Sequence, residues 1–290
     1  MIKNFDFQNR AYTLGRSLLL LATFLVLLFN NTDTMMSYNK EHLSCSKLPI
    51  PTTFCVSDMI GMNYEIMRWI MIVIILIALL GFVPFITGIL HWYICYSIQQ
   101  SFLPVDGGDQ ISMVITFLLI PITLLDFRFN YFLSEKRELN KYIVNITGSF
   151  MLLIKVQVFL IYINAAIERL RNKEWADGTA LYYFFSDSVF GIPKWEYQLT
   201  NFIWESNLII LITWSVTALE FFLAFNIIQN KATNKIALIL GIIFHIFIGL
   251  TIGIWTFAIV MIACLILYLH TDMKIFNKDK EGKGNGIISK

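Results

Sequence analysis

Four polar residues interrupt the apolar stretch QVFLIYINAAIER, and they are the first candidates for chemistry: Gln157, Asn164, Glu168 and Arg169. Steps of seven and four residues place Gln157, Asn164 and Glu168 on one helical face. We predict that this face lines an outward-opening cavity, where Gln157 and Asn164 contact the substrate. The alternative is a capped helix end, in which Glu168 binds Arg171 one turn later.

Glu168 and Arg169 would supply the catalytic groups of this cavity. A carboxylate whose pKa is raised by burial acts as an acid or a base, and a guanidinium holds a carbonyl or a carboxylate. Trp175 and Asp177 follow in the segment EWADGTALYYF and are predicted to contact the substrate at the rim. The aromatic residues of this segment are also typical of the belt at a membrane interface, and a short interfacial helix here would cover the cavity.

A second pair of candidates, Glu220 and His245, lies on consecutive apolar segments joined by the turn QNKATNK. The two residues are at similar distances from that turn, so a hairpin would bring them to nearly equal depth. We predict that they pair. A histidine at this position either transfers protons, since it titrates near neutrality, or ties helices together through a hydrogen bond.

Asp109 is the last catalytic candidate, in the segment VDGGDQ. Two glycines before it suit a turn, and Asp109 then becomes the N-cap of the helix that follows. The predicted topology nevertheless places this turn on the same membrane face as Glu168 and Arg169. Both interpretations, a cap and a member of the site, stay open.

Composition defines the environment in which these residues act. Of 290 residues 57% are hydrophobic and 14% are charged, and the mean hydropathy is +0.66. Such a chain is a multi-spanning membrane protein, and long apolar runs without alternation predict an all-α bundle. We find no nucleotide fingerprint, zinc-ligand spacing or nucleophile elbow, so the sequence indicates neither a metal site nor a nucleic-acid partner, and it names no cofactor.

Runs of roughly 20 apolar residues, divided where glycine and proline interrupt them, predict about eight transmembrane helices. Two long runs are divided, one at Pro84 and one between Gly249 and Gly253. The expected helices are 11–29, 66–82, 84–98, 111–127, 142–167, 202–228, 236–250 and 253–269. They form one domain over residues 1–272, and the tail 273–290 is expected to be disordered.

An even number of crossings puts both termini on one side of the membrane. With the termini in the cytoplasm, the inner segments carry more lysine and arginine than the outer ones, as the positive-inside rule requires. Cys45 and Cys55 then lie in an outer loop, where we predict a disulfide; free thiols are the alternative. Cys95 and Cys264 lie within helices and are expected to pack as small apolar residues.

The order of several segments resembles a known family. IYINAAIERL, a tryptophan and DGTALYY are followed by LEFFLAFNI and LGIIFHIFIGLTIGIWTF. This order is similar to the HTTM family, the membrane domain of vitamin K-dependent gamma-carboxylase and its bacterial relatives. Within that family, NRAYTLGRSLLLLATFLVLLFN, GILHWYICYSI and GGDQISMVITFLLI resemble the sporulation-delaying protein B branch. The resemblance covers nearly the whole chain.

The two branches imply different functions. The carboxylases use a lysine base on a YxxAGxKK helix end and a histidine before a GGD helix; the matching places here are Glu168 and Arg169, and Asp109 or Gln110. Because arginine stays protonated, it cannot serve as that base. The sporulation-delaying branch implies maturation of a secreted antimicrobial peptide toxin. Its members act in the bacterial plasma membrane on an exported precursor, with a small partner protein encoded nearby.

Two other functions are kept beside this leading hypothesis. One is a quinone-dependent modifying enzyme related to the carboxylases but with a different base. The other is a transporter or immunity protein that carries or binds a hydrophobic peptide, although no internal inverted repeat is evident in the chain.

Overall fold

The computed structural model describes residues 5–36, 45, 48–103, 106–134, 138–187, 191–228 and 231–270. Within these residues the regular structure is helical and contains no strand, so the all-α prediction is confirmed. The longer helices are α1 (Arg10–Phe29), α4 (Tyr64–Leu79), α5 (Pro84–Ser101), α6 (Gly107–Leu124), α7 (Lys141–Arg171), α10 (Lys194–Trp204), α11 (Leu208–Phe225), α12 (Lys231–Ile252) and α13 (Trp255–Leu265). The short helices are α2 (Thr32–Met36), α3 (Thr53–Met59), α8 (Lys173–Ala176) and α9 (Ala180–Ser186).

Five of the described helices, α1, α6, α7, α11 and α12, are long and apolar enough to cross a membrane. A shorter apolar stretch follows at Trp255–Leu269. Large apolar side chains point outward from several of these helices, among them Leu211 and Ile243. A hydrophobic exterior of this kind suits a lipid environment, so the chain is a membrane protein built from apolar helices.

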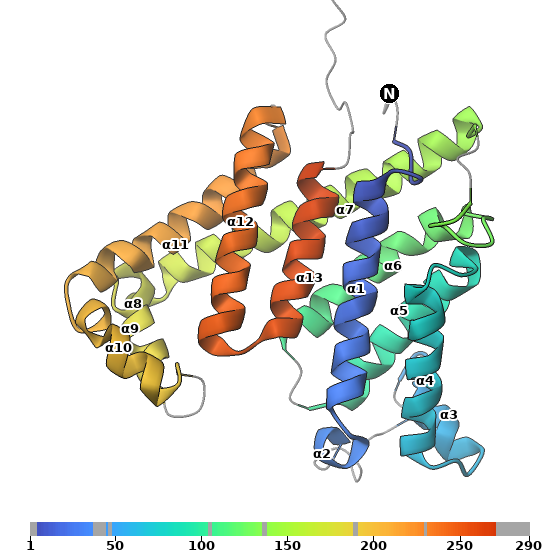
Figure 1. The fold of residues 1–290 in the computed structure, drawn as a ribbon, viewed down its shortest axis with the longest axis horizontal. Helices are drawn as coiled ribbons and strands as arrows, with labels where there is room; N and C mark the ends of the chain where they lie inside the picture. Colours follow the sequence, from blue (N-terminus) through green and yellow to red (C-terminus); the bar gives the residue numbers. More distant parts are fainter. Residues whose placement is uncertain are drawn as a thin grey trace, which may run out of the picture.

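The long helix α7 organises the bundle (Figure 1). It has 31 residues and, at 1.5 Å per residue, is about 46 Å long, so it must tilt to fit a hydrocarbon layer of about 30 Å. In Figure 1 it runs diagonally behind α1, α12 and α13, with α11 along one half of it and α6 beside the other. The main core lies where α1, α6, α7 and α13 meet, and a second core joins α1, α4 and α5.

The predicted division at Pro84 is confirmed. Gly81 and Val83 have positive φ values of 91° and 45°, and Pro84 begins α5, where its missing N–H costs nothing. The backbone N–H of Val83 donates to the carbonyl of Phe129 at 2.8 Å, and that of Tyr131 donates to Gly81 at 3.0 Å. The turn between α4 and α5 is therefore held against the loop that follows α6.

The predicted division between Gly249 and Gly253 is also confirmed. The break falls at Gly253, which has a φ of 83°, and α13 starts at Trp255. Gly249 stays inside α12, where a Cβ would come within 2.8 Å of the Trp255 ring. Its small size therefore allows the hairpin of α12 and α13 to close.

Two other predicted boundaries are wrong. The stretch 202–228 is not one helix, because α10 ends at Trp204 and α11 begins at Leu208. Between them the hydroxyl of Ser206 bonds locally to the backbone, which competes with a continuous helix. The helix predicted over 142–167 continues to Arg171, so the charged residues at its end lie within its last turn.

The N-terminal end of α1 and the C-terminal end of α13 lie at the same end of the bundle in Figure 1. The segment that directly follows α13 also contacts α1, since a Cβ on Gly15 would approach the Leu267 side chain to 2.7 Å. The predicted disordered tail, 273–290, lies outside the described residues.

Close packing of α5 on α6 leads to a first prediction. A Cβ on Gly88 would lie 2.6 Å from Cβ of Thr123, so Gly88→Ala must push the two helices apart. We expect it to lower the free energy of unfolding by about 1–3 kcal/mol. Gly107→Ala is the matched control, since its added carbon would meet Phe257 at an ordinary 3.5 Å. Thermal unfolding in detergent compares them, and equal stability of both variants would contradict the prediction.

Candidate functional site

The candidate site is centred on an ion pair between α7 and α11. Arg169 donates from Nε to Oε2 of Glu220 at 2.6 Å and from Nη2 to Oε1 at 2.8 Å. Glu220 is buried, with 4% of its surface exposed. An isolated carboxylate there would be costly, whereas two parallel bonds from a guanidinium offset much of its lost hydration. The pair therefore ties the end of α7 to the middle of α11.

Trp175 covers the outer side of this pair. Its ring centroid lies 3.9 Å from Cζ of Arg169, a cation–π contact. The position follows from a local signal: Asn172 ends α7 and caps α8, accepting hydrogen bonds from the backbone N–H groups of Glu174 and Trp175. This cap turns the chain back, so that Trp175 returns over the arginine four residues after α7 has ended. The guanidinium is thus held between a carboxylate and an aromatic ring.

A second polar contact lies two helical turns deeper in the bundle. The hydroxyl of Tyr162 is 2.9 Å from Nε2 of His245, and both side chains are buried. Nδ1 of His245 has no hydrogen-bond partner among the described residues, and its ring packs edge-on against Phe257. Since a neutral imidazole has one donor and one acceptor nitrogen, this histidine keeps one free polar atom beside the core.

The predicted pair between Glu220 and His245 is wrong. Glu220 binds Arg169, and His245 binds Tyr162, so α7 supplies both partners. The physical reason is packing: α11 lies closely along α7 and has far less contact with α12. Their shared turn therefore brings the two segments together near the turn alone, and the side chains farther along find partners on α7.

The predicted polar face of α7 does not line the interior. Asn164 and Glu168 are exposed, Gln157 is half-buried, and Glu168 forms an ion pair with Arg171 at 2.6 Å. This is the capped-end alternative. Successive helical residues are about 100° apart, so Glu168 and Arg169 point in different directions. The prediction that Glu168 and Arg169 act side by side in one cavity is therefore wrong, and Arg169 alone turns inward.

The interior face of α7, which is mostly apolar, also carries Lys155, Tyr162 and Arg169. These residues repeat every seven positions, and Lys155 and Tyr162 are almost fully buried. Lys155 and Tyr162 were not among the predicted site residues, because the prediction rested on the neighbouring stripe of polar residues. The available signal was the heptad spacing of a lysine, a tyrosine and an arginine in one apolar helix.

Asp109 lies elsewhere. The N-cap of α6 is Asp106, not Asp109, and its carboxylate accepts from the backbone N–H of Asp109 at 3.1 Å. Asp109 instead lines a cavity of about 10 Å³ between α1, α5, α6 and α13, which has room for one water molecule. It makes no hydrogen bond or ion pair with Arg169, Glu220 or His245 in the described structure.

Asp177 stabilises the turn after α8. Its carboxylate accepts from the backbone N–H of Thr179 at 3.1 Å and from the Thr179 hydroxyl at 2.6 Å, and these bonds lower the pKa of Asp177. The side chain is exposed and, among the described residues, forms no hydrogen bond or ion pair with Arg169. The expected short helix follows it as α9, so this segment is ordered by Asp177 and Gly178, whose φ is 85°.

Cys45 and Cys55 form a disulfide, with Cα atoms 5.8 Å apart, at the start of α3. Cys95 and Cys264 are buried free cysteines. Among the described residues no group of three or more histidine, cysteine, aspartate or glutamate side chains is arranged to hold a metal ion. The groups available for chemistry near α7 are therefore a carboxylate, a guanidinium, a phenol, an imidazole and the amine of Lys155.

Two proteins of Bacillus subtilis (strain 168) are similar to this chain over most of its length. The sporulation-delaying protein SdpB is 50% identical over 271 residues, which are 93% of this chain and 84% of that protein. The chain belongs to the SdpB family. A further member, named uncharacterized protein YitO, is 32% identical over 275 residues, 92% of this chain and 88% of its own length. No family model and no solved structure matches.

Membership of the SdpB family confirms the branch predicted from the resemblance. The alignment with SdpB spans nearly the whole chain, so it covers helices from both sides of the ion pair.

The ion pair leads to a second prediction, on stability. Glu220→Leu leaves Arg169 facing the bundle without its carboxylate, and we expect the free energy of unfolding to fall by about 3 kcal/mol. The double variant Arg169→Met with Glu220→Leu removes both charges and is expected to recover most of that loss. Glu168→Gln breaks only an exposed pair and is the control, with a change of about 0.5 kcal/mol or less.

Chemical denaturation in detergent measures all three variants. A double variant as unstable as Glu220→Leu alone would show that the two charges do not depend on each other, and would contradict the prediction.

Proposed function

We propose that this protein is required for the maturation of a secreted antimicrobial peptide toxin from an exported precursor. Membership of the SdpB family supports this function, together with the resemblance to a branch that matures such peptides. We also propose that the protein belongs to the wider HTTM superfamily. The single structural observation behind it is the Arg169–Glu220 pair beneath Trp175, which presents a buried acid and a carbonyl-binding guanidinium at one end of the bundle.

The proposed substrate site faces the outside of a bacterial plasma membrane. The C-terminal end of α7 lies with α8, α9 and α10 at one end of the bundle, and the two chain ends described lie at the other (Figure 1). In this orientation α4, α5 and α13 also cross the membrane, which together with the five long apolar helices makes about eight crossings. The basic loop between α6 and α7 then faces the cytoplasm, in agreement with the positive-inside rule. An exported precursor would reach Arg169 after translocation.

The surroundings of the site suit an apolar peptide. On α10, Trp195, Leu199 and Phe202 recur at helical spacing and are all exposed, at 66%, 69% and 67%. A helix with such a face lies in the membrane interface. A hydrophobic precursor segment placed along it would lie close to α9 and α11, the helices on which α10 packs.

Arg169 and Glu220 would act by exchanging partners. A carbonyl or carboxylate of the precursor takes the place of Glu220 on the guanidinium, because the same fork binds either group. Glu220, released into an apolar surrounding, then serves as an acid or a base. A small partner protein completes the site, with the exported precursor as the substrate.

Orientation is tested with two lysines at opposite ends of α7. Lys141 and Lys173 are both exposed, and each is replaced by cysteine in turn. We expect a membrane-impermeant thiol reagent to label Lys173→Cys in intact cells and to label Lys141→Cys only after the cells are opened. Background labelling of the native free cysteines should be low, because Cys95 and Cys264 are buried. Labelling of Lys141→Cys in intact cells would place the site inside.

Function is tested by the intact mass of the peptide secreted from cells that express the precursor, the partner and this protein. We expect Glu220→Gln to reduce the mature peptide by about a hundredfold or more, because loss of a general acid or base costs that much. Arg169→Gln is expected to act similarly. Glu168→Gln, on the same helical turn but in an exposed pair, is the matched control and should leave the yield unchanged.

Immunoblots of the membrane fraction show that each variant is present at normal levels. Normal processing by Glu220→Gln would show that Glu220 takes no part in the reaction. If Glu168→Gln abolishes processing instead, the outward face of α7 is the one that meets the precursor or the partner.

A further inference from the structure

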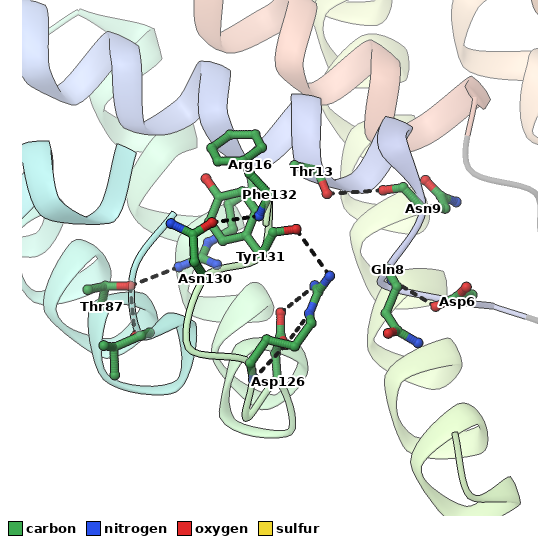
Figure 2. Close-up of polar contacts among 12 residues, drawn as sticks. Asp6, Gln8, Asn9, Thr13, Arg16, Thr87, Asp126, Asn130, Tyr131 and Phe132 are labelled. Carbon is green, nitrogen blue, oxygen red and sulfur yellow. Dashed lines mark hydrogen bonds and ion pairs between the residues drawn. The ribbon is translucent and has the colours of Figure 1, made fainter. Parts of the chain in front are cut away.

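A polar groove lies at the end of the bundle opposite the candidate site. It has a volume of about 450 Å³, within the range of small-molecule sites, and runs between the start of α1 and the loop after α6 (Figure 2). Its polar lining comes from Gln8 just before α1, from Arg10, Thr13 and Ser17 on α1, and from Arg128, Tyr131 and Ser134 on the loop. None of these residues takes part in the proposed peptide maturation.

The groove carries an excess of positive charge. Arg10 is exposed and makes no ion pair with a described residue. Arg16 lies behind the groove and is buried; its Nη2 donates to the hydroxyl of Thr87 at 3.1 Å, and its guanidinium lies 5.1 Å from the Tyr131 ring centroid. Arg16 likewise makes no ion pair within the described chain. Among the described residues, neither of these two arginines beside the groove therefore has a carboxylate partner.

The remaining charges do not reverse this balance. Arg128 forms two hydrogen bonds with Asp126, each at 2.7 Å, so these two groups compensate each other. The Asp6 carboxylate accepts from the backbone N–H of Gln8 at 2.7 Å, beside the groove (Figure 2). These five ionised groups, all in the described part of the chain, together leave one net positive charge, and the N-terminus of the 20-residue helix α1 adds to it.

The hydrogen-bond donors of the groove and the apolar side chains around it indicate which kind of anion it binds. The hydroxyls of Ser17 and Tyr131 are 3.2 Å apart at the wall of the groove, and the exposed Arg10 also lines it. Around them Leu14, Phe132 and Leu133 are 51%, 54% and 82% exposed. A compact, positively charged site surrounded by apolar side chains at the end of a membrane helix is the arrangement that binds an anionic lipid headgroup.

We propose that this groove binds the phosphate of an anionic phospholipid. The guanidinium of Arg10 would bind the phosphate oxygens, the helix N-terminus would add to the positive potential, and the acyl chains would lie along Leu14, Phe132 and Leu133. A bound lipid would then connect α1 to the loop that also holds the turn between α4 and α5. This proposal does not depend on the proposed peptide maturation.

The test uses the full-length protein in a neutral detergent, titrated with phosphatidylglycerol or phosphatidylcholine and followed by native mass spectrometry. We expect phosphatidylglycerol to be retained and phosphatidylcholine to be lost under the same conditions. Arg10→Gln is expected to weaken phosphatidylglycerol binding about fivefold, the usual effect of one basic residue near an anionic lipid. Because Arg10 is exposed at the first turn of α1, the variant should fold normally.

Lys141→Gln is the matched control, an exposed basic residue at the same end of the bundle but outside the groove. It should bind phosphatidylglycerol as the wild type does. Equal weakening by both substitutions would mean attraction to surface charge in general and would overturn the proposal. Displacement of the lipid by millimolar inorganic phosphate would also overturn it, because the groove would then be a site for free phosphate.

Discussion

The structure depends on how the end of α7 is rotated, and the double hydrogen bond between Arg169 and Glu220 sets that rotation. Neither group is stable alone in an apolar bundle, so each requires the other. With Arg169 directed at α11, the residue seven positions earlier, Tyr162, faces His245, and Glu168 must point outward. One ion pair therefore decides which side chains of a 31-residue helix meet the interior.

The two ends of the bundle differ in charge and in the ligands they suit. At one end the guanidinium of Arg169 is matched by a carboxylate and covered by Trp175, which suits an exchange with a carbonyl or carboxylate of an apolar peptide. At the other end Arg10 and Arg16 form no ion pair with a described residue, an arrangement that suits an external anion. This asymmetry follows from the placement of a few carboxylates rather than from the net charge of +2.

Breaks between helices were predicted well where glycine or proline makes them. Pro84 and Gly253 act through their own backbone geometry, which is independent of the rest of the fold. The break at Ser206 was missed because a single polar residue interrupts a helix only where a local hydrogen bond replaces the helical one. The cap of α8 by Asn172 was likewise missed, although it places Trp175 over Arg169.

The sequence by itself determined the all-helical membrane class, two helix divisions and the family, because hydropathy, backbone restriction and residue order are local properties. It also contained Arg169, Glu220, Trp175 and His245 as candidates. Only the tertiary structure decided their partners: Glu220 binds Arg169 rather than His245, and Glu168 lies outside. The reason is geometric. Adjacent helical residues differ by about 100°, so the packing of α7 against α11 had to be known before an inner face could be chosen.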